Sequence, residues 1–425
     1  MMVLFPIIFI LGYVFIAVEH LIKINKSATA LVLGSILWLL WFIVSGNNAT
    51  TSHELESSLL GIAPIIFFLM GAMTIVAIVD SYDGFDIITS RIHTKSTLRL
   101  LWLISIVTFF MSAVLDNMTT AIVMVTLTKK LVSDVRSRRY FAGMIIIAAN
   151  AGGAASPIGD VTTTMLWLGG QISAMGIVER VGVASLLNLF IPLLFISYRF
   201  RGKPLANEFD TNKNSIVPSR LDRDIVFLCG IGGLVLVPVY RSVFGLPPYM
   251  GMALSLGLLW LLTDIILKRK DEATQDYFKI GKILKKVDLP SILFFTGILL
   301  AVSVLEANGQ LAGLSNLLTE KIGDLKIIVT SIGLFSSVID NVPLVAAIMG
   351  MYNLSAFPMD SFLWEFTAYC AGTGGSILII GSAAGVATMG LEDISFGWFF
   401  RHITPLALIG YFGGCVAYLL MQYLF

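Results

Sequence analysis

The sequence predicts an all-α polytopic membrane protein, organised as two inverted-topology repeats. Of its 425 residues, 57% are hydrophobic and 13% are charged, whereas an ordinary soluble domain has roughly 25% charged residues. Apolar segments of about 20 residues recur along the whole chain, as expected for membrane-spanning helices. These segments, residues 3–18 for example, lack the alternation with period two that is typical of a transmembrane barrel. A set of polar motifs also recurs in the two halves of the chain.

The first half is predicted to hold five spans and one re-entrant hairpin. Its first three single spans are expected at residues 2–18, 28–44 and 59–79. Residues 100–128 are apolar, carry Asp116 and Asn117 near the middle, and have basic residues at both ends. Because positive charge concentrates in cytoplasmic loops, this segment should enter and leave the membrane on one side. We therefore predict a hairpin with Asp116 and Asn117 at its tip.

Residues 141–197 must cross the membrane twice. A broken helix is expected in the first half of this stretch. Residues 150–163 contain three glycines and Pro157, which do not form a stable continuous helix. Such an unwound segment is tolerated at membrane depth where protein surrounds it. Residues 201–223 form the longest polar connector and separate a first repeat, residues 1–200, from a second repeat, residues 224–425.

The second half repeats this order of elements. We expect spans at residues 225–240, 249–267 and 289–305, a hairpin at 327–351, a broken helix at 362–389 and a last span at 403–423. Asp340 and Asn341 lie at the tip of this second hairpin. With this threading, 24 of the 28 Lys and Arg residues fall on one side, which is thereby assigned as cytoplasmic. The four exceptions are Arg180, Arg241, Lys321 and Lys326. The prediction is ten full spans and two hairpins, with both termini outside.

An internal duplication is indicated by four landmarks in the same order. Residues 64–71 match 290–297, with Asp80 opposite Glu306; the two Asp-Asn tips match; and residues 151–156 match 371–376. Asp160 then lies opposite Ser382 after a two-residue insertion. Each half has an odd number of spans, so the halves should have opposite orientations. Inverted repeats with broken helices that meet at the membrane midplane are typical of secondary transporters.

Two tips and two unwound segments should converge on one polar site. Its candidate cation- and proton-binding residues are Asp116, Asn117, Asn150, Asp160, Thr162 and Thr163 from the first half, and Ser336, Asp340, Asn341, Ser376 and Ser382 from the second. Hard cations prefer such oxygen ligands, whereas an anionic substrate would favour basic groups or helix N-termini. The polar cores of these four segments contain no Lys, Arg or His. The sequence therefore predicts a site for a small cation.

The carboxyl groups also suggest a role for protons. Burial favours the protonated form of a carboxyl group, and a bound cation favours the ionised form. Protons and a cation would then compete for the same group, and competition at a site exposed alternately to each side produces exchange. Because Asp160 faces Ser382 in the repeat, we expect the first half to hold the tighter cation site.

The polar motifs together resemble those of the NhaD-type sodium/proton antiporters, a family of the ion transporter superfamily. The matching stretches are residues 116–120, 150–153, 156–164, 340–345, 372–376 and 381–385. The resemblance implies exchange of sodium or lithium for protons across a bacterial inner (plasma) membrane, with Asp116, Asp160 and Asp340 as ligands of the transported ion. It also implies a homodimer in which a transport domain moves like an elevator against a fixed scaffold. Membrane lipid is the other expected partner; no nucleic acid and no cofactor beyond the transported ions are expected.

Two other function classes remain as alternatives. The first is a sodium-coupled carrier of small organic anions on the same fold. Dicarboxylate carriers of the superfamily have Ser-Asn-Thr at the tips, and Asp replaces that Ser at both tips here, where it would repel an anion. The second is an intramembrane aspartyl protease, which needs Gly-x-Gly-Asp; Pro157, at the start of Pro-Ile-Gly-Asp, stands in place of the first Gly. The antiporter is favoured, and no enzymatic activity is expected.

Overall fold

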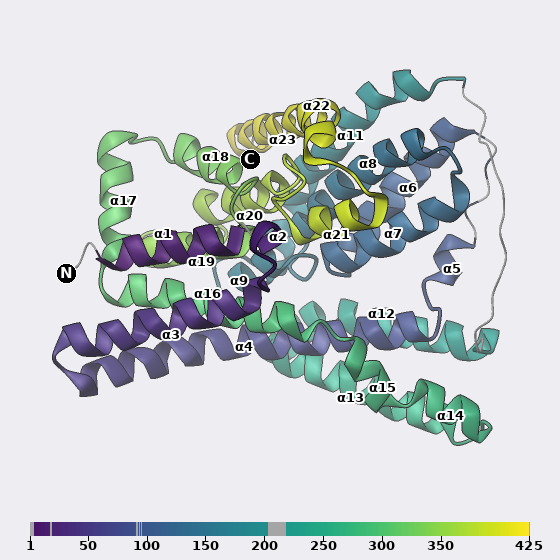
Figure 1. The fold of residues 1–425 in the computed structure, drawn as a ribbon, viewed down its shortest axis with the longest axis horizontal. Coiled ribbons are helices and arrows are strands. Elements are labelled where there is room, and N and C mark those ends of the chain that lie inside the picture. Colours follow the sequence, from purple (N-terminus) through teal and green to yellow (C-terminus); the bar gives the residue numbers. More distant parts are fainter. Residues whose placement is uncertain are drawn as a thin grey trace.

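The computed structural model describes residues 4–17, 19–90, 92, 94, 96–202 and 218–424. Every secondary-structure element within these residues is a helix (Figure 1), as the composition predicts. Residues 203–217 of the predicted connector lie outside the described part. Helices that connect the longer elements are α2 (Glu19–Ile22), α5 (Asp86–Thr89), α14 (Glu272–Phe278), α15 (Ile280–Ile283), η2 (Leu284–Lys286), α17 (Gln310–Lys321) and α22 (Phe396–His402).

Seven helical runs in the described residues are long and apolar enough to cross a membrane. They include α3 (Lys26–Ser45), α4 (Asn48–Ser81), α12 (Arg220–Phe244), α13 (Pro248–Leu267), the run Glu272–Ala307, which ends in α16 (Leu289–Ala307), and α23 (Thr404–Leu424). The remaining run continues from α10 (Ala174–Gly176) through the π-helix η1 (Ile177–Val181) into α11 (Gly182–Phe200). Many side chains on these runs, such as Leu60 and Phe244, are both apolar and exposed, as lipid-facing surfaces require. The chain is a multi-pass membrane protein.

One predicted boundary is wrong. The sequence predicts a loop at residues 46–54 before a span at 59–79, but α4 begins at Asn48, within that loop, and continues to Ser81. The side chain of Asn47 accepts a hydrogen bond from the N–H of Thr50 and caps the helix, so the helix can begin before the apolar run. The polar first turns of α4 are largely exposed. Hydropathy marks where a helix becomes apolar, and not where it starts.

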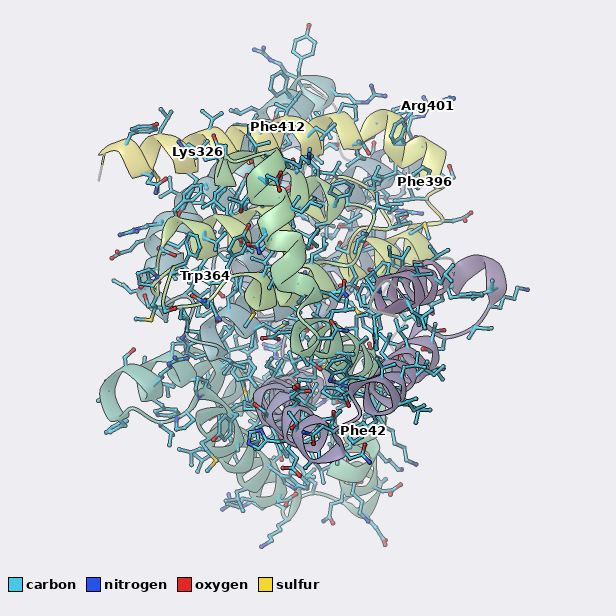
Figure 2. All side chains as sticks on the ribbon, turned by 90° about the vertical axis from the view of Figure 1, so that its left-hand side faces the viewer. Phe42, Lys326, Trp364, Phe396, Arg401 and Phe412 are labelled. Carbon is cyan, nitrogen blue, oxygen red and sulfur yellow. The ribbon has the colours of Figure 1, made fainter. Side chains whose placement is uncertain are left out.

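The helices form two bodies. The lower layer in Figure 1 consists of α3, α4, α12, α13 and α16, with α1 (Leu4–Ala17) packed on α3. The upper bundle consists of α6 (Thr97–Ser112), α7 (Asn117–Leu131), α8 (Val135–Ala154), α11, α18 (Leu325–Phe335), α20 (Phe362–Gly374), α21 (Ala383–Glu392), α22 and α23. In the perpendicular view, Phe412 of α23 and Phe42 of α3 lie towards opposite edges of the molecule (Figure 2). Between the bodies lie α9 (Val161–Leu168), which packs on α4 and α20, and α19 (Asn341–Met351), which packs on α16 and α20.

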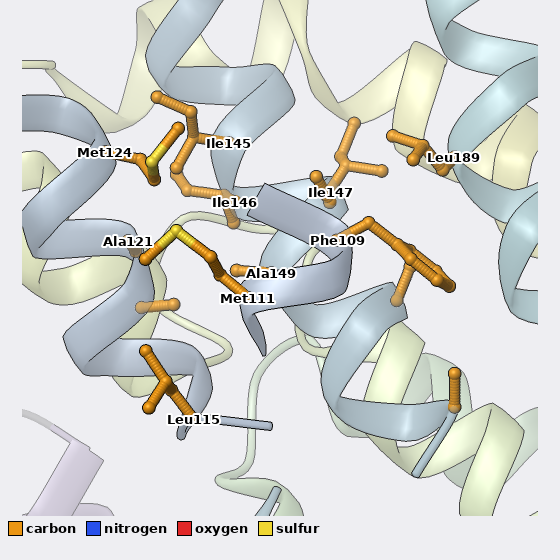
Figure 3. Close-up of a cluster of buried hydrophobic side chains, with 14 of the residues drawn as sticks. Phe109, Met111, Leu115, Ala121, Met124, Ile145, Ile146, Ile147, Ala149 and Leu189 are labelled. Atoms are coloured by element: carbon orange, nitrogen blue, oxygen red, sulfur yellow. The ribbon is translucent and has the colours of Figure 1, made fainter. Parts of the chain in front are cut away.

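The core of the upper bundle surrounds α8. All residues of α8 from Tyr140 to Ala154 are buried, as expected for a helix that is apolar on every side. Figure 3 shows Ile145 and Ile146 facing Met124 of α7, and Ile147 near Leu189 of α11. This packing fixes the position of the C-terminal end of α8, where the polar residues begin.

The predicted helix breaks are present in both halves. Residues 113–116 separate α6 from α7, and residues 336–340 separate α18 from α19. Residues 155–160 separate α8 from α9, and residues 375–382 separate α20 from α21. The first break is narrower than residues 150–163, so Asn150 belongs to α8 whereas Thr162 and Thr163 belong to α9. Each break thereby leaves the C-terminal end of one helix and the N-terminal end of the next inside the protein.

The same close backbone contact occurs in both halves. A Cβ atom on Gly152 would lie 2.1 Å from the carbonyl oxygen of Phe109, and one on Gly374 would lie 1.9 Å from that of Gly333. Only glycine permits this approach between α8 and α6, and between α20 and α18. Gly374 lies 222 positions after Gly152, and Ser382 lies 222 positions after Asp160. The two-residue insertion inferred from the sequence is therefore wrong, because the spatial register needs none.

Candidate functional site

The four helix breaks meet where the two bodies adjoin. Helix α7 packs on α21, and α9 packs on α19, so each hairpin contacts the broken helix of the other half. Helices α8 and α20 also pack on each other. We name Asp116 and Asn117 the first tip, and Asp340 and Asn341 the second tip. The predicted convergence of tips and unwound segments is present in this arrangement.

One polar chain runs from the first tip into the second half. The amide Nδ2 of Asn117 donates to Oδ1 of Asn150 at 3.1 Å. Nδ2 of Asn150 in turn donates to the hydroxyl of Ser382 at 3.0 Å. Asn150 is completely buried, so both ends of its amide need partners within the protein. Asn150 thus links the first tip to the second break.

The second tip reaches Asp160 directly. Nδ2 of Asn341 donates to Oδ2 of Asp160 at 3.0 Å. The other carboxylate oxygen accepts from the N–H of Thr162 at 3.3 Å, so Asp160 caps α9. Asp160 is 3% exposed, and no Lys or Arg nitrogen of the described residues lies within 4.0 Å of it. A buried charge without an ionic partner is costly, so this carboxyl group requires either a proton or a bound cation.

The first tip reaches the second half's break through Asn150, whereas the second tip contacts the first half's break directly. The residues at equivalent positions explain this difference. In the spatial register, Asn150 corresponds to Gly372, and Ser382 to Asp160. A Cβ on Gly372 would lie 3.8 Å from Oδ2 of Asp160. The Asp160 side chain contacts Asn341 directly, and the residue beside it is glycine where the other half has Asn150. At the second half's break, the shorter Ser382 is reached through the Asn150 side chain. Because Ser382 stands where the first half has Asp160, only the first half contributes a carboxylate at its break.

Asp116 shares a small cavity with Asp160. The cavity has a volume of about 30 Å³ and is lined by both carboxylates, by Thr164 and by apolar residues including Met252 and Leu234 of the lower layer. A water molecule requires roughly 10–15 Å³ in this measure, so the space suits a water molecule or a small cation. Asp116 also caps α7, because its Oδ1 accepts from the N–H of Thr119 at 2.8 Å.

Asp340 faces a different and larger cavity. This cavity of about 300 Å³ is also lined by Tyr13, Glu19, Lys26 and Asp288. Nζ of Lys26 lies 3.8 Å from Oδ2 of Asp340, and the hydroxyl of Tyr13 accepts from the backbone N–H of Asp340 at 2.7 Å. The three predicted carboxylates therefore do not meet in one place: Asp116 and Asp160 line one cavity, and Asp340 lines another.

The predicted hydroxyl residues separate into two groups. Ser336 donates to the carbonyl oxygen of Ala371 at 2.8 Å, and Ser376 donates to that of Thr373 at 2.7 Å. Thr163 donates to the carbonyl oxygen of Asp160 at 3.0 Å. These three hydroxyls therefore hold the backbone of the breaks. The hydroxyls of Ser382 and Thr162 differ: Ser382 joins the polar chain above, and Thr162 is buried without a hydrogen-bond partner among the described residues.

Several residues at this site escape prediction from the sequence. Tyr13 and Lys26 lie far from the motifs in sequence, and no spacing points to them. Ser112, which donates to the carbonyl oxygen of Ala149 at 2.6 Å, occupies the position in the first hairpin that Ser336 occupies in the second. The equivalent spacing before each tip, four residues before the Asp, could have identified it.

Arg241 could have been singled out from the sequence. It is one of the four basic residues that the predicted topology places on the other side of the membrane, and its guanidinium donates to the carbonyl oxygen of Trp167 at 2.6 Å. It therefore satisfies the C-terminal end of α9 from α12. Arg180, a second exception, lies 3.4 Å from the buried carboxylate of Glu365. These two of the four exceptions to the positive-inside pattern have specific partners.

The chain is similar to a family of transporters and to several named sodium/proton antiporters. The family model described as citrate transporter matches residues 13–368. Sodium/proton antiporter 1 of Arabidopsis thaliana is 44% identical over 97% of this chain and 71% of the relative. Sodium/proton antiporter 2 of the same plant is 41% identical, with 97% and 98% covered. The Na⁺/H⁺ antiporter NhaD of Alkalimonas amylolytica is 30% identical over 97% of this chain and 89% of the relative.

The chain belongs to the NhaD-type antiporters of the citrate transporter family. The family resemblance seen in the motifs is thereby confirmed. The family and these relatives are transporters and not enzymes, so the protease alternative is wrong. The apolar helices and these relatives together identify the chain as a multi-pass membrane transporter.

A solved structure supports the fold independently. The crystal structure of the Alcanivorax borkumensis YdaH transporter aligns with a TM-score of 0.62 over 94% of this chain and 99% of that chain. The sequence identity is 11%, so the likeness concerns the fold alone.

Proposed function

We propose that this protein exchanges sodium or lithium for protons across a membrane, and that Asp160 is the group for which the cation and the proton compete. The observation that carries the proposal is the buried Asp160 carboxyl group, which has two neutral donors and no cationic partner among the described residues. One proton or one monovalent cation neutralises it equally well. Relatives that are named sodium/proton antiporters support the same cargo.

The surrounding groups suit a small hard cation. Oxygen ligands are available from Asp160 and, across the shared cavity, from Asp116. The hydroxyl of Thr162, two residues after Asp160, has no hydrogen-bond partner among the described residues and is a further candidate ligand in the proposal. Asn341 donates to the ionised carboxylate and orients it. When a cation leaves, a proton on Asp160 restores neutrality, which makes the two occupants mutually exclusive. Asp340, Ser336 and Ser376 lie outside this cavity; in the proposal Ser336 and Ser376 hold the backbone of the second half's breaks, and Asp340 lines the larger cavity.

The alternating exposure of this site is assigned to a movement of the upper bundle against the lower layer, as in an elevator. The site residues lie in helices of the upper bundle and in α9 and α19, and both of these helices pack on the lower layer. The inverted repeat is also part of the proposal. It is supported by paired contacts, since α3 packs on α16 as α13 packs on α4, and α7 packs on α21 as α9 packs on α19.

The repeat boundaries, the oligomeric state and the membrane are proposed as the sequence predicts them. The repeats comprise residues 1–200 and 224–425, and each has five spans and a hairpin. The expected assembly is a homodimer surrounded by lipid in the inner membrane of a bacterium. The transported ions are the only cofactors in this account.

Transport of small organic anions is a second candidate, because the matching family model is described as citrate transporter. The charge of the site opposes it. Asp116 and Asp160 line the same small cavity, and a carboxylate substrate there would face two carboxyl groups and no basic side chain in the cavity lining. Cation exchange is therefore the better supported function.

The test uses everted membrane vesicles from a host that lacks its own antiporters. A fluorescent pH-gradient dye reports the response to added sodium, lithium or potassium for the wild type, Asp160→Asn and Asp224→Asn. Asp224 is a matched control, because its side chain is 48% exposed. The proposal predicts collapse of the gradient with sodium in the wild type and in Asp224→Asn, and no collapse in Asp160→Asn. If well-expressed wild type responds to none of the cations, the antiporter proposal fails and uptake of radiolabelled dicarboxylates is the next measurement.

A further inference from the structure

Two residues of the N-terminal helices hold the second tip. Tyr13 belongs to α1 and Lys26 begins α3. The hydroxyl of Tyr13 accepts from the backbone N–H of Asp340 at 2.7 Å. Nζ of Lys26 lies 3.8 Å from Oδ2 of Asp340 and 4.5 Å from the centre of the Phe294 ring on α16. A lysine ammonium is therefore placed at the carboxylate of one Asp-Asn motif.

The first tip has no such ammonium. No Lys or Arg nitrogen of the described residues lies within 4.0 Å of Asp116, and the lower-layer residues beside its cavity are apolar. The two aspartates otherwise have the same structural role, which is to cap a helix. Oδ1 of Asp116 accepts from the backbone N–H of Thr119, and Oδ1 of Asp340 accepts from that of Val342. Helix capping occupies Oδ1 in both tips. The contact of Lys26 with Oδ2 of Asp340 is thus an addition that capping does not require.

The pair is arranged so that it can open. The separation of 3.8 Å exceeds the length of a hydrogen bond, so the two groups attract as charges without a direct bond. The side chain of Lys26 is 29% exposed and that of Asp340 is 20% exposed, so both face the cavity. Partly exposed pairs of this kind are weak. A cation that enters the cavity can compete with the ammonium for Oδ2.

The cavity lining favours cations. Glu19, Asp288 and Asp340 contribute carboxylates to it, and Lys26 is the one basic side chain among its lining residues. Cations would therefore concentrate in the cavity and meet Asp340 there. Replacement of an ammonium by a sodium ion leaves the charge next to Asp340 unchanged, so the exchange has a small electrostatic cost.

We propose that Lys26 is a tethered competitor of the transported cation at Asp340 and so sets the apparent affinity of the transporter for that cation. This inference rests on the proposed cation/proton exchange. Lys26 and Tyr13 belong to helices that pack with the lower layer, whereas Asp340 begins α19, which lies between the two bodies. Cation binding at Asp340 would therefore also release one contact between the bodies. Lys26 acts through Asp340 and is a specificity-determining residue, and it is not part of the Asp160 site.

The experiment compares Lys26→Gln, Lys26→Met and Lys26→Arg with Lys23→Gln, which removes an exposed charge three residues earlier. Sodium titrations in everted vesicles at fixed pH give the apparent KM and the maximal rate. We expect Lys26→Gln and Lys26→Met to lower the KM for sodium about two- to fivefold, the range for a partly exposed ion pair. Lys26→Arg and Lys23→Gln should keep the wild-type KM. Purified protein gives a second readout, since the sodium concentration that half-saturates the increase in Tm should fall in the same two variants.

The outcomes separate the two proposals. An unchanged or raised KM in both neutral variants, with a lower maximal rate or a lower Tm without sodium, would show that Lys26 only holds the second tip in place. That result overturns the competitor role while the wild type still exchanges sodium for protons. Absence of exchange in both the wild type and Lys23→Gln would instead contradict the proposed function. If neither neutral variant reaches the membrane, the Tm titration on Lys26→Arg decides, because a loss of sodium dependence there contradicts competition by charge.

Discussion

Asn341 and Asp160 lie 181 positions apart and meet in one hydrogen bond of 3.0 Å, from Nδ2 to Oδ2, inside the protein. The bond joins the tip of the second hairpin to the broken helix of the first half. It exists because Asp160 caps α9 at the break after α8, and α9 packs on α19, the helix that Asn341 begins. The bond is the strongest link between the geometry and the proposed chemistry.

Replacement of Asn341 by Ala should weaken sodium transport. The substitution removes the side-chain donor to Oδ2 of Asp160, and a hydrogen bond to a charged group contributes about 1.5–3 kcal/mol. We therefore expect the apparent KM for sodium to rise about 10- to 100-fold, measured by dye titration in vesicles. Asn48→Ala, at an exposed position at the start of α4, is the control and should match the wild type. A wild-type KM in Asn341→Ala would mean that this bond does not support cation binding.

The bridge made by Asn150 should appear as coupling between residues. Asn150→Ala leaves the buried amide of Asn117 without its acceptor and removes the donor to Ser382. Each buried group left without a partner costs about 1–3 kcal/mol, so Tm in detergent should fall clearly. In a double-mutant cycle with Asn117→Ala, the two losses should be less than additive because they share one bond. Full additivity would contradict a direct interaction in the folded protein.

Glycine at the α8–α6 crossing should be essential for folding. A Cβ on Gly152 would lie 2.1 Å from the carbonyl oxygen of Phe109, and backbone cannot withdraw as a flexible side chain can. Gly152→Ala should destabilise the protein by roughly 1–3 kcal/mol or more, seen as a lower Tm and less protein in the membrane. A Cβ on Gly390, in α21, would meet no neighbouring atom within 4 Å, so Gly390→Ala should be neutral or slightly stabilising. Equal behaviour of the two variants would refute the close-contact explanation.

Acidification should weaken the apparent affinity for sodium. A proton and a sodium ion neutralise the same carboxyl group in this account, so a lower pH converts more of Asp160 to the form that cannot bind the cation. Where one proton competes fully, the KM for sodium rises about tenfold for each unit by which pH falls. Sodium titrations at several pH values in vesicles measure this slope. A KM that is independent of pH, with the maximal rate alone changing, would argue against a shared site.

The local polar motifs are predictable from the sequence, and their partners are not. The hairpin tips and helix breaks follow from Asp, Asn, Gly and Pro inside apolar runs, because these residues either cap helices or interrupt them. The contact of Asn150 with Ser382 joins residues 232 positions apart, and only the packing of α8 on α20 and α21 decides it. The contact of Lys26 with Asp340 is likewise not predictable from the sequence. In the sequence, Lys26 is only one of the basic residues that follow the first apolar segment.

The register of the repeat illustrates a second limit. The sequence around Gly152 and Gly153 can be matched to the glycines at 372 or to those at 374 and 375, and composition does not distinguish them. The closest backbone approach selects Gly374, since the contact of Gly152 with Phe109 is repeated by that of Gly374 with Gly333. Asp160 and Ser382, which the sequence sets opposite each other after an insertion, are separated by the same 222 positions as Gly152 and Gly374, so the backbone contacts need no insertion. Sequence pattern identifies the elements, and backbone distance is needed to align them.

The most direct test of the central claim is the release of protons when sodium binds. Purified protein in a weakly buffered detergent solution is titrated with sodium chloride while a pH indicator records protons, with choline chloride as the salt control. Competition at Asp160 predicts that sodium releases protons from the wild type and from Asp224→Asn, and that Asp160→Asn releases none. Sodium binding without proton release in the wild type, detected as an increase in Tm at constant pH, would contradict the claim that one carboxyl group serves both ions.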